Sequence, residues 1–350
     1  MTPHEILTLL FKNKKYLNLT KSIGKRYQPY INTARAYYKL DQDTLITSEE
    51  RRVLINISYA KSDDQLKTII KDLYMQDDLS ENINYIRAAC QHLLDLWRSK
   101  RLNDHGNNEG WLRSNVYSML WDRAFLFHDQ FYIKRAECQS AVIKFLQLDD
   151  PDGDLVQQKI DFILRNSNDE SDYLSTEEKP GDKSENDDVC KGRQVQRHML
   201  DLWNKWLGSP LLTSQLEAIT YQWHGSSLHV FGTKMLSDQK VVSYKKSNVT
   251  ISNTSDHFAD VAYFLLIVIS IKRSVTLNYM KLTTMLAAIN RHSIASLEIR
   301  SSNQAYHDDS APSSQSSNDN DNIPIDLDLP YIKDAIEMCS TITHQKNVVY

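Results

Sequence analysis

Glycine is scarce in this chain, with only 9 residues in 350. Loops that cradle the phosphates of nucleotides depend on glycine, because only glycine lets the backbone come close to a phosphate. The sequence contains no Walker-type G-x-x-x-x-G-K loop, no G-x-G-x-x-G turn and no G-x-S-x-G motif. These absences argue against a nucleotide-dependent enzyme.

Cysteine is also sparse, and its four residues stand far apart at positions 90, 138, 190 and 339. No two of them have the spacing of a zinc site, so we expect no structural zinc. Four cysteines are too few for a disulfide scaffold, and a reducing compartment fits best.

Long apolar runs are absent as well. The longest, Val261–Ile271, has 11 residues, whereas a membrane-spanning helix needs about 20. The apolar piece Ile6–Phe11 is followed by lysines, which is the wrong order for a signal peptide. We therefore expect an intracellular protein of the nucleus or cytoplasm, neither secreted nor bound to a membrane.

Charge is nearly balanced over the whole chain, with a net value of −4 at pH 7. Between residues 191 and 300, however, 13 Lys and Arg stand against 6 Asp and Glu. The surplus acid lies in Asn166–Asp188 and beyond Asp308. The basic region could hold a polyanion such as a nucleic acid, or it could be a solvated basic face.

Hydrophobic periodicity divides the chain into regions that should fold differently. In the clearest helix, Ser80–Arg98, Ser80 is a plausible N-cap. The polar stretch Asn103–Gly110 is a candidate domain boundary. We predict four regions: a helical N-terminal region (1–105), a mixed domain (106–300), a flexible acidic and Ser-rich segment (301–325), and a C-terminal helix and tail (326–350).

The mixed domain is expected to follow the order helix, undecided element, strand, strand, helix, strand, strand, helix. These elements are Trp111–Phe127, Lys134–Leu148, Val156–Leu164, Asp172–Lys179, Gln194–Leu207, Leu216–Trp223, Leu228–Met235 and Phe258–Met285. A short third strand could follow at Val241–Tyr244, and the last helix could be broken. This order predicts an α/β or α+β core.

One predicted hairpin, Lys159–Pro180, combines residues that suggest a chemistry. Side chains two apart on a strand share a face, so Glu177 and Lys179 should point the same way. Antiparallel pairing should bring Asp161, near the start of the first strand, beside them. Two carboxylates and an amine at one sheet edge suit phosphodiester hydrolysis, because carboxylates hold Mg²⁺ and an amine offsets developing negative charge.

Asp161 followed by Glu177-Glu178-Lys179 resembles the signature of the PD-(D/E)XK (restriction endonuclease-like) superfamily. It is also similar to fungal nuclease-like proteins in which a K-x-D strand is followed by E-x-K-P. The resemblance covers roughly residues 109–290 and implies an αβββαβ core. It implies that Asp161 and Glu177 bind Mg²⁺ or Mn²⁺ and that Lys179 assists the attack. Ile160 stands where the name-giving motif has proline.

The same resemblance implies accessory residues around the site. The preceding helix often supplies another acid, for which Glu109 and Asp122 are candidates, and Glu137 is a third. The following helix often carries a polar or basic residue that faces the site, for which Gln194 and Arg193 are candidates. Glu178 beside Glu177 leaves the register open, although the spacing to Lys179 favours Glu177.

Two functions remain open. The first is a Mg²⁺-dependent endo- or exonuclease that acts on DNA or RNA. The second is a catalytically inactive nuclease fold that serves as a scaffold for nucleic acid or protein. The loop expected at Gly181–Asp188 is strongly acidic, and negative charge near a site that must accept a polyanion favours the second.

Overall fold

The chain is represented by a computed structural model. It describes residues 46–304, except for 77–78, 104–106, 152–154, 181–184 and 237–238. The first 45 residues of the expected helical region lie outside the described residues. So do residues 305–350, which hold most of the expected Ser-rich segment and the expected C-terminal helix.

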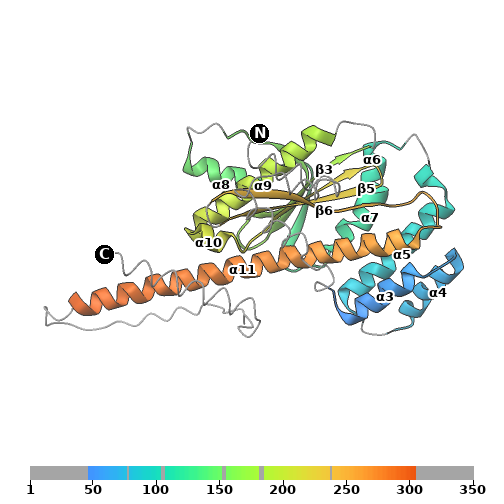
Figure 1. The fold of residues 1–350 in the computed structure, drawn as a ribbon, viewed down its shortest axis with the longest axis horizontal. Coiled ribbons are helices and arrows are strands. Elements are labelled where there is room, and N and C mark those ends of the chain that lie inside the picture. The colour runs from blue at the N-terminus through green and yellow to red at the C-terminus, as the bar shows by residue number, and fades with distance from the viewer. Residues whose placement is uncertain are drawn as a thin grey trace, which may run out of the picture.

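Six strands form one mixed sheet at the centre of the molecule, in the spatial order β1 to β6 (Figure 1). They are β1 (Phe131–Gln139), β2 (Lys159–Asn166), β3 (Asp172–Lys179), β4 (Ala218–His224), β5 (Ser227–Met235) and β6 (Val241–Thr250). All neighbours are antiparallel except β3 and β4, which are parallel. Helix α9 (Glu185–Leu207) connects these two strands. The expected mixture of helices and strands is confirmed.

The strands predicted from alternation lie close to their expected bounds. β3 begins at Asp172 and ends at Lys179, as predicted, and it pairs with β2 as a hairpin. β6 is longer than predicted and reaches Thr250. The expected acidic loop is shorter than predicted, since α9 already begins at Glu185. Acidic residues are favourable in the first turn of a helix, where they face the positive end of its dipole.

The undecided segment Lys134–Leu148 contains both kinds of element. β1 ends at Gln139, and helix α8 (Ala141–Asp149) follows with Ser140 as its N-cap. β1 has a bulge between Arg135 and Cys138, where two consecutive residues have positive φ. A bulge breaks the alternation of side chains, which is why spacing alone did not identify this strand.

The segment expected as a single helix at Trp111–Phe127 is a series of short helical pieces. They are α6 (Glu109–Leu112), the π-helical η5 (Arg113–Tyr117), α7 (Ser118–Leu120) and the 3₁₀ turn η6 (Asp122–Ala124). A π-helical turn widens the helix and is often found at functional sites.

Helices cover both faces of the sheet. On one face, α9 lies close to β4, where a Cβ added to Gly192 would meet Thr220 and Gln222 at 3.4 and 3.7 Å. On the other face, Trp121 packs on Tyr221 of β4 with ring centroids 3.9 Å apart. The sheet therefore forms the middle layer of three. A short helix, α10 (Pro210–Thr213), leads from α9 into β4.

The N-terminal helices pack against the long last helix. They are α3 (Ser48–Ser58), α4 (Asp63–Tyr74) and α5 (Glu81–Arg98), and a 3₁₀ turn, η4 (Arg101–Asn103), follows. α11 (Phe258–Gln304) is continuous over 47 residues, so the helix expected at Phe258–Met285 is unbroken and longer than predicted. It runs beneath the sheet in Figure 1 and extends beyond it. Arg273 of α11 donates to both carboxylate oxygens of the buried Glu50 at 2.7 Å.

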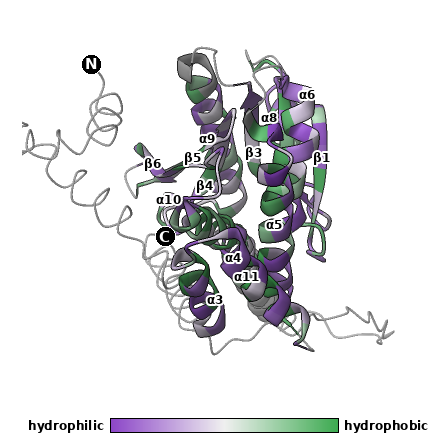
Figure 2. Cartoon of the chain, turned by 90° about the vertical axis from the view of Figure 1, so that its right-hand side faces the viewer, coloured by the Kyte–Doolittle hydropathy of each residue, from purple (hydrophilic) through white to green (hydrophobic). Residues whose placement is uncertain are grey.

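Apolar packing joins the N-terminal helices to the sheet region through one continuous core. Figure 2 shows α3 with hydrophilic and hydrophobic residues on different sides, as expected of a helix that covers a core. Ser80 accepts a hydrogen bond from the N–H of Ile83, which confirms the predicted N-cap of α5. In the part of the chain that the structure describes, no helix combines the length and apolarity needed to cross a membrane.

Candidate functional site

The hairpin β2–β3 brings Asp161 against the Glu177-Glu178-Lys179 segment. The regular ladder runs to the pair Phe162 and Thr176. One residue further on, the Asp161 carboxylate accepts a hydrogen bond from the backbone N–H of Glu178 at 2.9 Å. Asp161 is therefore fixed at the end of β3 that carries these three residues.

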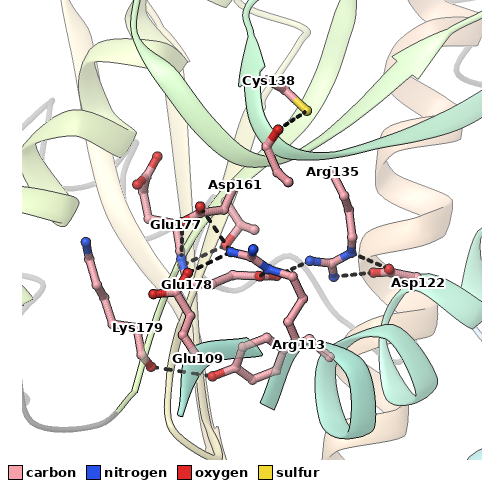
Figure 3. Close-up of polar contacts among 12 residues, drawn as sticks. Glu109, Arg113, Asp122, Arg135, Cys138, Asp161, Glu177, Glu178 and Lys179 are labelled. Carbon is pink, nitrogen blue, oxygen red and sulfur yellow. Dashed lines mark hydrogen bonds and ion pairs between the residues drawn. The ribbon is translucent and has the colours of Figure 1, made fainter. Parts of the chain in front are cut away.

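The three residues of the segment divide between the two faces of the sheet. Glu177 and Lys179 project to the face that α9 covers, and Glu178 projects to the opposite face, as alternation along a strand requires. Figure 3 shows Glu178 among the arginines and the side chains of Glu177 and Lys179 on the other side of β3. The adjacent carboxylates therefore have different environments.

Glu178 is the centre of a buried network of ion pairs. Its side chain is fully buried, and it accepts hydrogen bonds from Arg113 at 2.8 Å and from Arg135 at 2.7 Å. Arg135 also binds Asp122 with two hydrogen bonds, at 2.5 and 2.7 Å. Arg113 reaches Asp161 at 3.2 Å and Glu109 at 2.7 Å. We call these six residues the arginine network.

Burial dominates the electrostatics of the arginine network. It raises the pKa of Glu178, although Arg135 and Arg113 oppose that effect. Burial likewise raises the pKa of Asp122 against the influence of Arg135. The network contains four carboxylates and two guanidinium groups, so its formal charge is negative when all are ionised. Negative charge in excess of the fixed cations is the condition in which a further cation binds favourably.

Glu177 lies in a second environment, under α9. It pairs with Lys191 of α9 at 2.7 Å, and Lys191 also donates to the backbone carbonyl of Lys159. Lys191 thus joins the helix to both strands of the hairpin. A polar or basic residue from the following helix was expected here, with Gln194 and Arg193 as candidates. Lys191 takes this position, and Gln194 bonds Gln158 at the surface.

Lys179 ends β3 beside the turn that follows β4. Its backbone carbonyl accepts hydrogen bonds from the N–H of Gly225 at 2.9 Å and from the hydroxyl of Tyr117 at 3.4 Å. Tyr117 also donates to the carbonyl of Gly225 and stacks on Trp223 at 4.8 Å. These contacts fix the backbone from which the Lys179 side chain extends.

The structure brings some of the predicted accessory acids together with the hairpin and leaves others apart. Glu109 and Asp122 both belong to the arginine network. Glu137 lies on the bulge of β1, where its exposed carboxylate pairs with Lys159 at 2.5 Å. The sequence analysis missed Arg113, Arg135 and Lys191. The signal for Arg113 was its position four residues after Glu109, which places both on one side of a helix.

The fold resemblance implies a divalent metal ion, so the donor set must be tested for it. Among the described residues, no group of three or more His, Cys, Asp or Glu side chains is placed to hold a metal ion. Mg²⁺ needs fewer protein ligands, since it keeps several waters and often uses one or two carboxylates together with phosphate oxygens. Asp161 and Glu177 lie on paired strands at one end of the hairpin, and each offers the hard oxygens that Mg²⁺ prefers. Their side chains have different partners, Arg113 and Lys191, so a shared ion requires these ion pairs to open.

A second charged cluster lies at the opposite end of the sheet, and we call it the lysine cluster. Its centre is the buried Glu217, just before β4, which accepts hydrogen bonds from Lys246 at 2.7 Å and from the hydroxyl of Tyr244. Burial alone would raise the pKa of Glu217, but Lys246 and Lys234 lower it. Burial lowers the pKa of Lys234 to about 8, and it also lowers the pKa of Lys281.

Comparison of the chain with protein-family models, curated proteins and solved structures finds no match to any of them.

Proposed function

We propose that this chain has a restriction endonuclease-like core and hydrolyses phosphodiester bonds of DNA or RNA with the help of Mg²⁺ or Mn²⁺. The observation that supports the proposal is the pairing of β2 with β3, which brings Asp161 to the end of β3 that carries Glu177 and Lys179. The order of elements supports it too. From Glu109 on, the helical segment, β1, β2, β3, α9 and β4 follow the αβββαβ order, with α8 as an addition between β1 and β2.

In this proposal Asp161 and Glu177 hold the cation, and each chain residue around them has a task. A bound Mg²⁺ supplies a water of lowered pKa and stabilises negative charge on the phosphate. Lys179 neutralises charge that develops at the reacting phosphate. Arg113 keeps Asp161 in place through its longest contact in the arginine network, 3.2 Å. Lys191 holds Glu177 against the sheet.

A second function, the inactive scaffold, is favoured by a specific observation. Both proposed metal ligands already have basic partners, Arg113 for Asp161 and Lys191 for Glu177. Ion pairs as buried as the one at Glu177, whose side chain is 9% exposed, are costly to open without a replacement charge. A bound cation would replace the positive charge of Arg113 and Lys191 at these carboxylates. A scaffold binds no cation, so its two ion pairs stay closed.

Cleavage and metal binding together distinguish the two functions. Purified protein is incubated with single-stranded and duplex DNA and with RNA, in Mg²⁺, in Mn²⁺ and in EDTA. The variants are Glu177→Gln and Lys179→Met. The matched control is Lys159→Met, since that lysine is exposed on the same hairpin and pairs only with a surface acid. Binding of Mn²⁺ is followed by electron paramagnetic resonance.

The nuclease predicts metal-dependent cleavage that falls by about 10²-fold or more in both site variants, the size typical of lost transition-state stabilisation. Lys159→Met should retain it. Mn²⁺ binding should weaken in Glu177→Gln and persist in Lys179→Met. Cleavage that survives both site substitutions contradicts the site. A wild-type protein that neither binds Mn²⁺ nor cleaves is the scaffold.

A further inference from the structure

Four side chains of β4 have buried polar atoms without a hydrogen-bond partner within the described part of the chain, namely Tyr221, Gln222, Trp223 and His224. By alternation along the strand, two of them lie on the face that α9 covers. They are Gln222, which is 1% exposed, and His224, which is 7% exposed. Both amide atoms of Gln222 and both ring nitrogens of His224 are unpaired there. A buried polar group without a partner destabilises the fold, because it loses its hydrogen bonds to water. Most native proteins avoid such groups, so two of them side by side require an explanation.

The strand register places these residues beside the E-x-K pair. In the parallel pair β3–β4, Gln222 lies opposite Glu177 and His224 lies opposite Lys179. Side chains opposite each other on neighbouring strands point to the same face of the sheet. The unpaired atoms of β4 therefore lie on the face that carries Glu177 and Lys179, which is the face away from the arginine network.

The two residues differ in their surroundings. Gln222, Glu177 and Lys191 line a closed pocket under α9, with room for about one water molecule. A bound water would satisfy the Gln222 amide. His224 lies further along, at the carboxyl end of β4, and its ring is 5.5 Å from that of His229 on β5. The carboxyl ends of parallel strands joined by a crossover helix are where ligands bind in open α/β sheets.

The chemistry around His224 selects an anionic ligand. An imidazole N–H donates to an oxygen, and the neighbouring Lys179 adds positive charge on the same face. The second imidazole, His229, lies beside it. In a nucleic acid strand the phosphate oxygens are the acceptors that recur along the backbone, and most protein contacts go to them.

We propose that His224, together with Lys179 and His229, binds a backbone phosphate of the substrate strand next to the phosphate at Asp161 and Glu177. This inference rests on the proposed function, because it places the same strand at the carboxyl ends of β3 and β4, where Glu177 and Lys179 lie. His224 is a binding residue: it holds the strand and takes no part in the bond that is cleaved.

The substitution His224→Phe tests the proposal with two opposite effects. Phenylalanine keeps a buried ring and removes both unpaired nitrogens. It breaks no hydrogen bond to any described residue, so the free protein should become as stable as the wild type or more stable. The affinity for a fluorescein-labelled single-stranded oligonucleotide in EDTA, measured by anisotropy with DNA and with RNA, should fall roughly 10- to 100-fold.

The control is His257→Gln, because His257 is exposed in the loop before α11. It should change neither stability nor affinity. Equal binding by wild type and His224→Phe overturns the proposal, as does a wild type that binds no oligonucleotide. A substitution that lowers stability and leaves affinity unchanged shows that His224 is structural.

The outcome is separable from that of the proposed function. Binding in EDTA needs no metal and no cleavage. If binding depends on His224 while cleavage is absent, the nuclease fails and the phosphate site stands. If cleavage depends on Glu177 while oligonucleotide binding is unchanged in His224→Phe, the nuclease stands and the phosphate site fails. Should His224→Phe not fold, imidazole ¹⁵N shifts of the wild type are recorded during titration with the oligonucleotide. A shift of the assigned His224 imidazole supports the site, and an unshifted His224 contradicts it.

Discussion

The arginine network and the lysine cluster are built around two buried glutamates of the same sheet, yet their charges are opposite. At Glu178, four carboxylates meet two arginines, and burial raises the pKa of the glutamate. At Glu217, one carboxylate faces three lysines, and their charge lowers its pKa in spite of burial. The sheet thus has a negative surplus at the arginine network, on one face of the carboxyl end of β3, and a positive surplus at the start of β4.

The contrast shows that burial alone does not decide what a carboxylate does. Glu217 is the only carboxylate among the charged groups named in its cluster, so its charge is needed to hold that end of the sheet together. Glu178 shares its arginines with three other acids, so no single charge is essential there. We infer that the lysine cluster stabilises the fold and that the arginine network leaves Asp161 able to exchange partners.

The largest effect is expected from Glu217→Gln. It removes the negative charge from a site that still contains Lys234, Lys246 and Lys281. Breaking a buried ion pair from one side typically destabilises by about 3–5 kcal/mol, because the remaining charge is left uncompensated. Chemical denaturation at neutral pH measures the loss. A loss smaller than that of Glu178→Gln would reverse the comparison.

The pH dependence of stability should reveal Lys234. Its ordinary pKa of 10.5 is lowered to about 8 in the folded protein, so between these values the unfolded chain binds more protons. Stability from this group is therefore present above pH 10.5 and lost as the pH falls through about 8. At 1.36 kcal/mol per unit, the change is at most about 3 kcal/mol.

The variant Lys234→Met isolates this contribution. The difference in unfolding free energy between wild type and Lys234→Met should shift in favour of the wild type as the pH rises from 8 to 10.5. Urea denaturation at several pH values gives both curves. Parallel curves would show that Lys234 titrates normally.

A smaller effect is expected from Glu178→Gln. Arg113 and Arg135 lose one partner but keep Asp161, Glu109 and Asp122. Hydrogen bonds to charged groups contribute about 1.5–3 kcal/mol, and burial already opposes the charge of Glu178. Denaturation under the conditions used for Glu217→Gln provides the comparison. An unfolded variant would mean that Glu178 is as essential as Glu217.

The smallest effect concerns a glycine at the lysine cluster. In Gly232→Ala the new Cβ would lie 2.3 Å from the Glu217 carboxylate and 3.0 Å from the ring of Tyr244. Overpacking of this kind destabilises by about 1–3 kcal/mol. The matched control is Gly192→Ala, whose Cβ meets its neighbours at 3.4 Å or more. Since alanine favours a helix by up to about 1 kcal/mol, the control should be neutral or stabilising. Thermal melts of both variants test the contrast.

Much of the sheet could be predicted because alternation is a local signal. β3 follows a run whose bounds are set by polar turns, and a hairpin, the shortest connection between strands, brings Asp161 to the end of β3. β1 could not be predicted because its bulge interrupts the alternation at Ala136 and Glu137. The π-helical turn at Arg113 likewise departs from helical periodicity.

The partners of the site could not be predicted for a different reason. Arg113 meets Glu178 from 65 residues away, and Arg135 meets it from 43 residues away. A local sequence pattern cannot predict such pairs, because it relates only residues that are close in the chain. The same holds for Gln222 and His224, which reach the site only through the parallel pairing of β3 with β4. The hairpin could therefore be predicted from the sequence, whereas the residues that surround the site could not.

That parallel pairing also has a consequence for how the protein folds. The hairpin β2–β3 can close within microseconds, since its strands are adjacent in sequence. The pairing of β3 with β4 must form later, because it joins Leu174 to Ile219, 45 residues further along the chain. Until the crossover through α9 is made, β3 presents an unpaired edge, the kind of surface that recruits strands of other chains. The step that assembles the two halves of the site is therefore also the step that protects the nascent chain from aggregation.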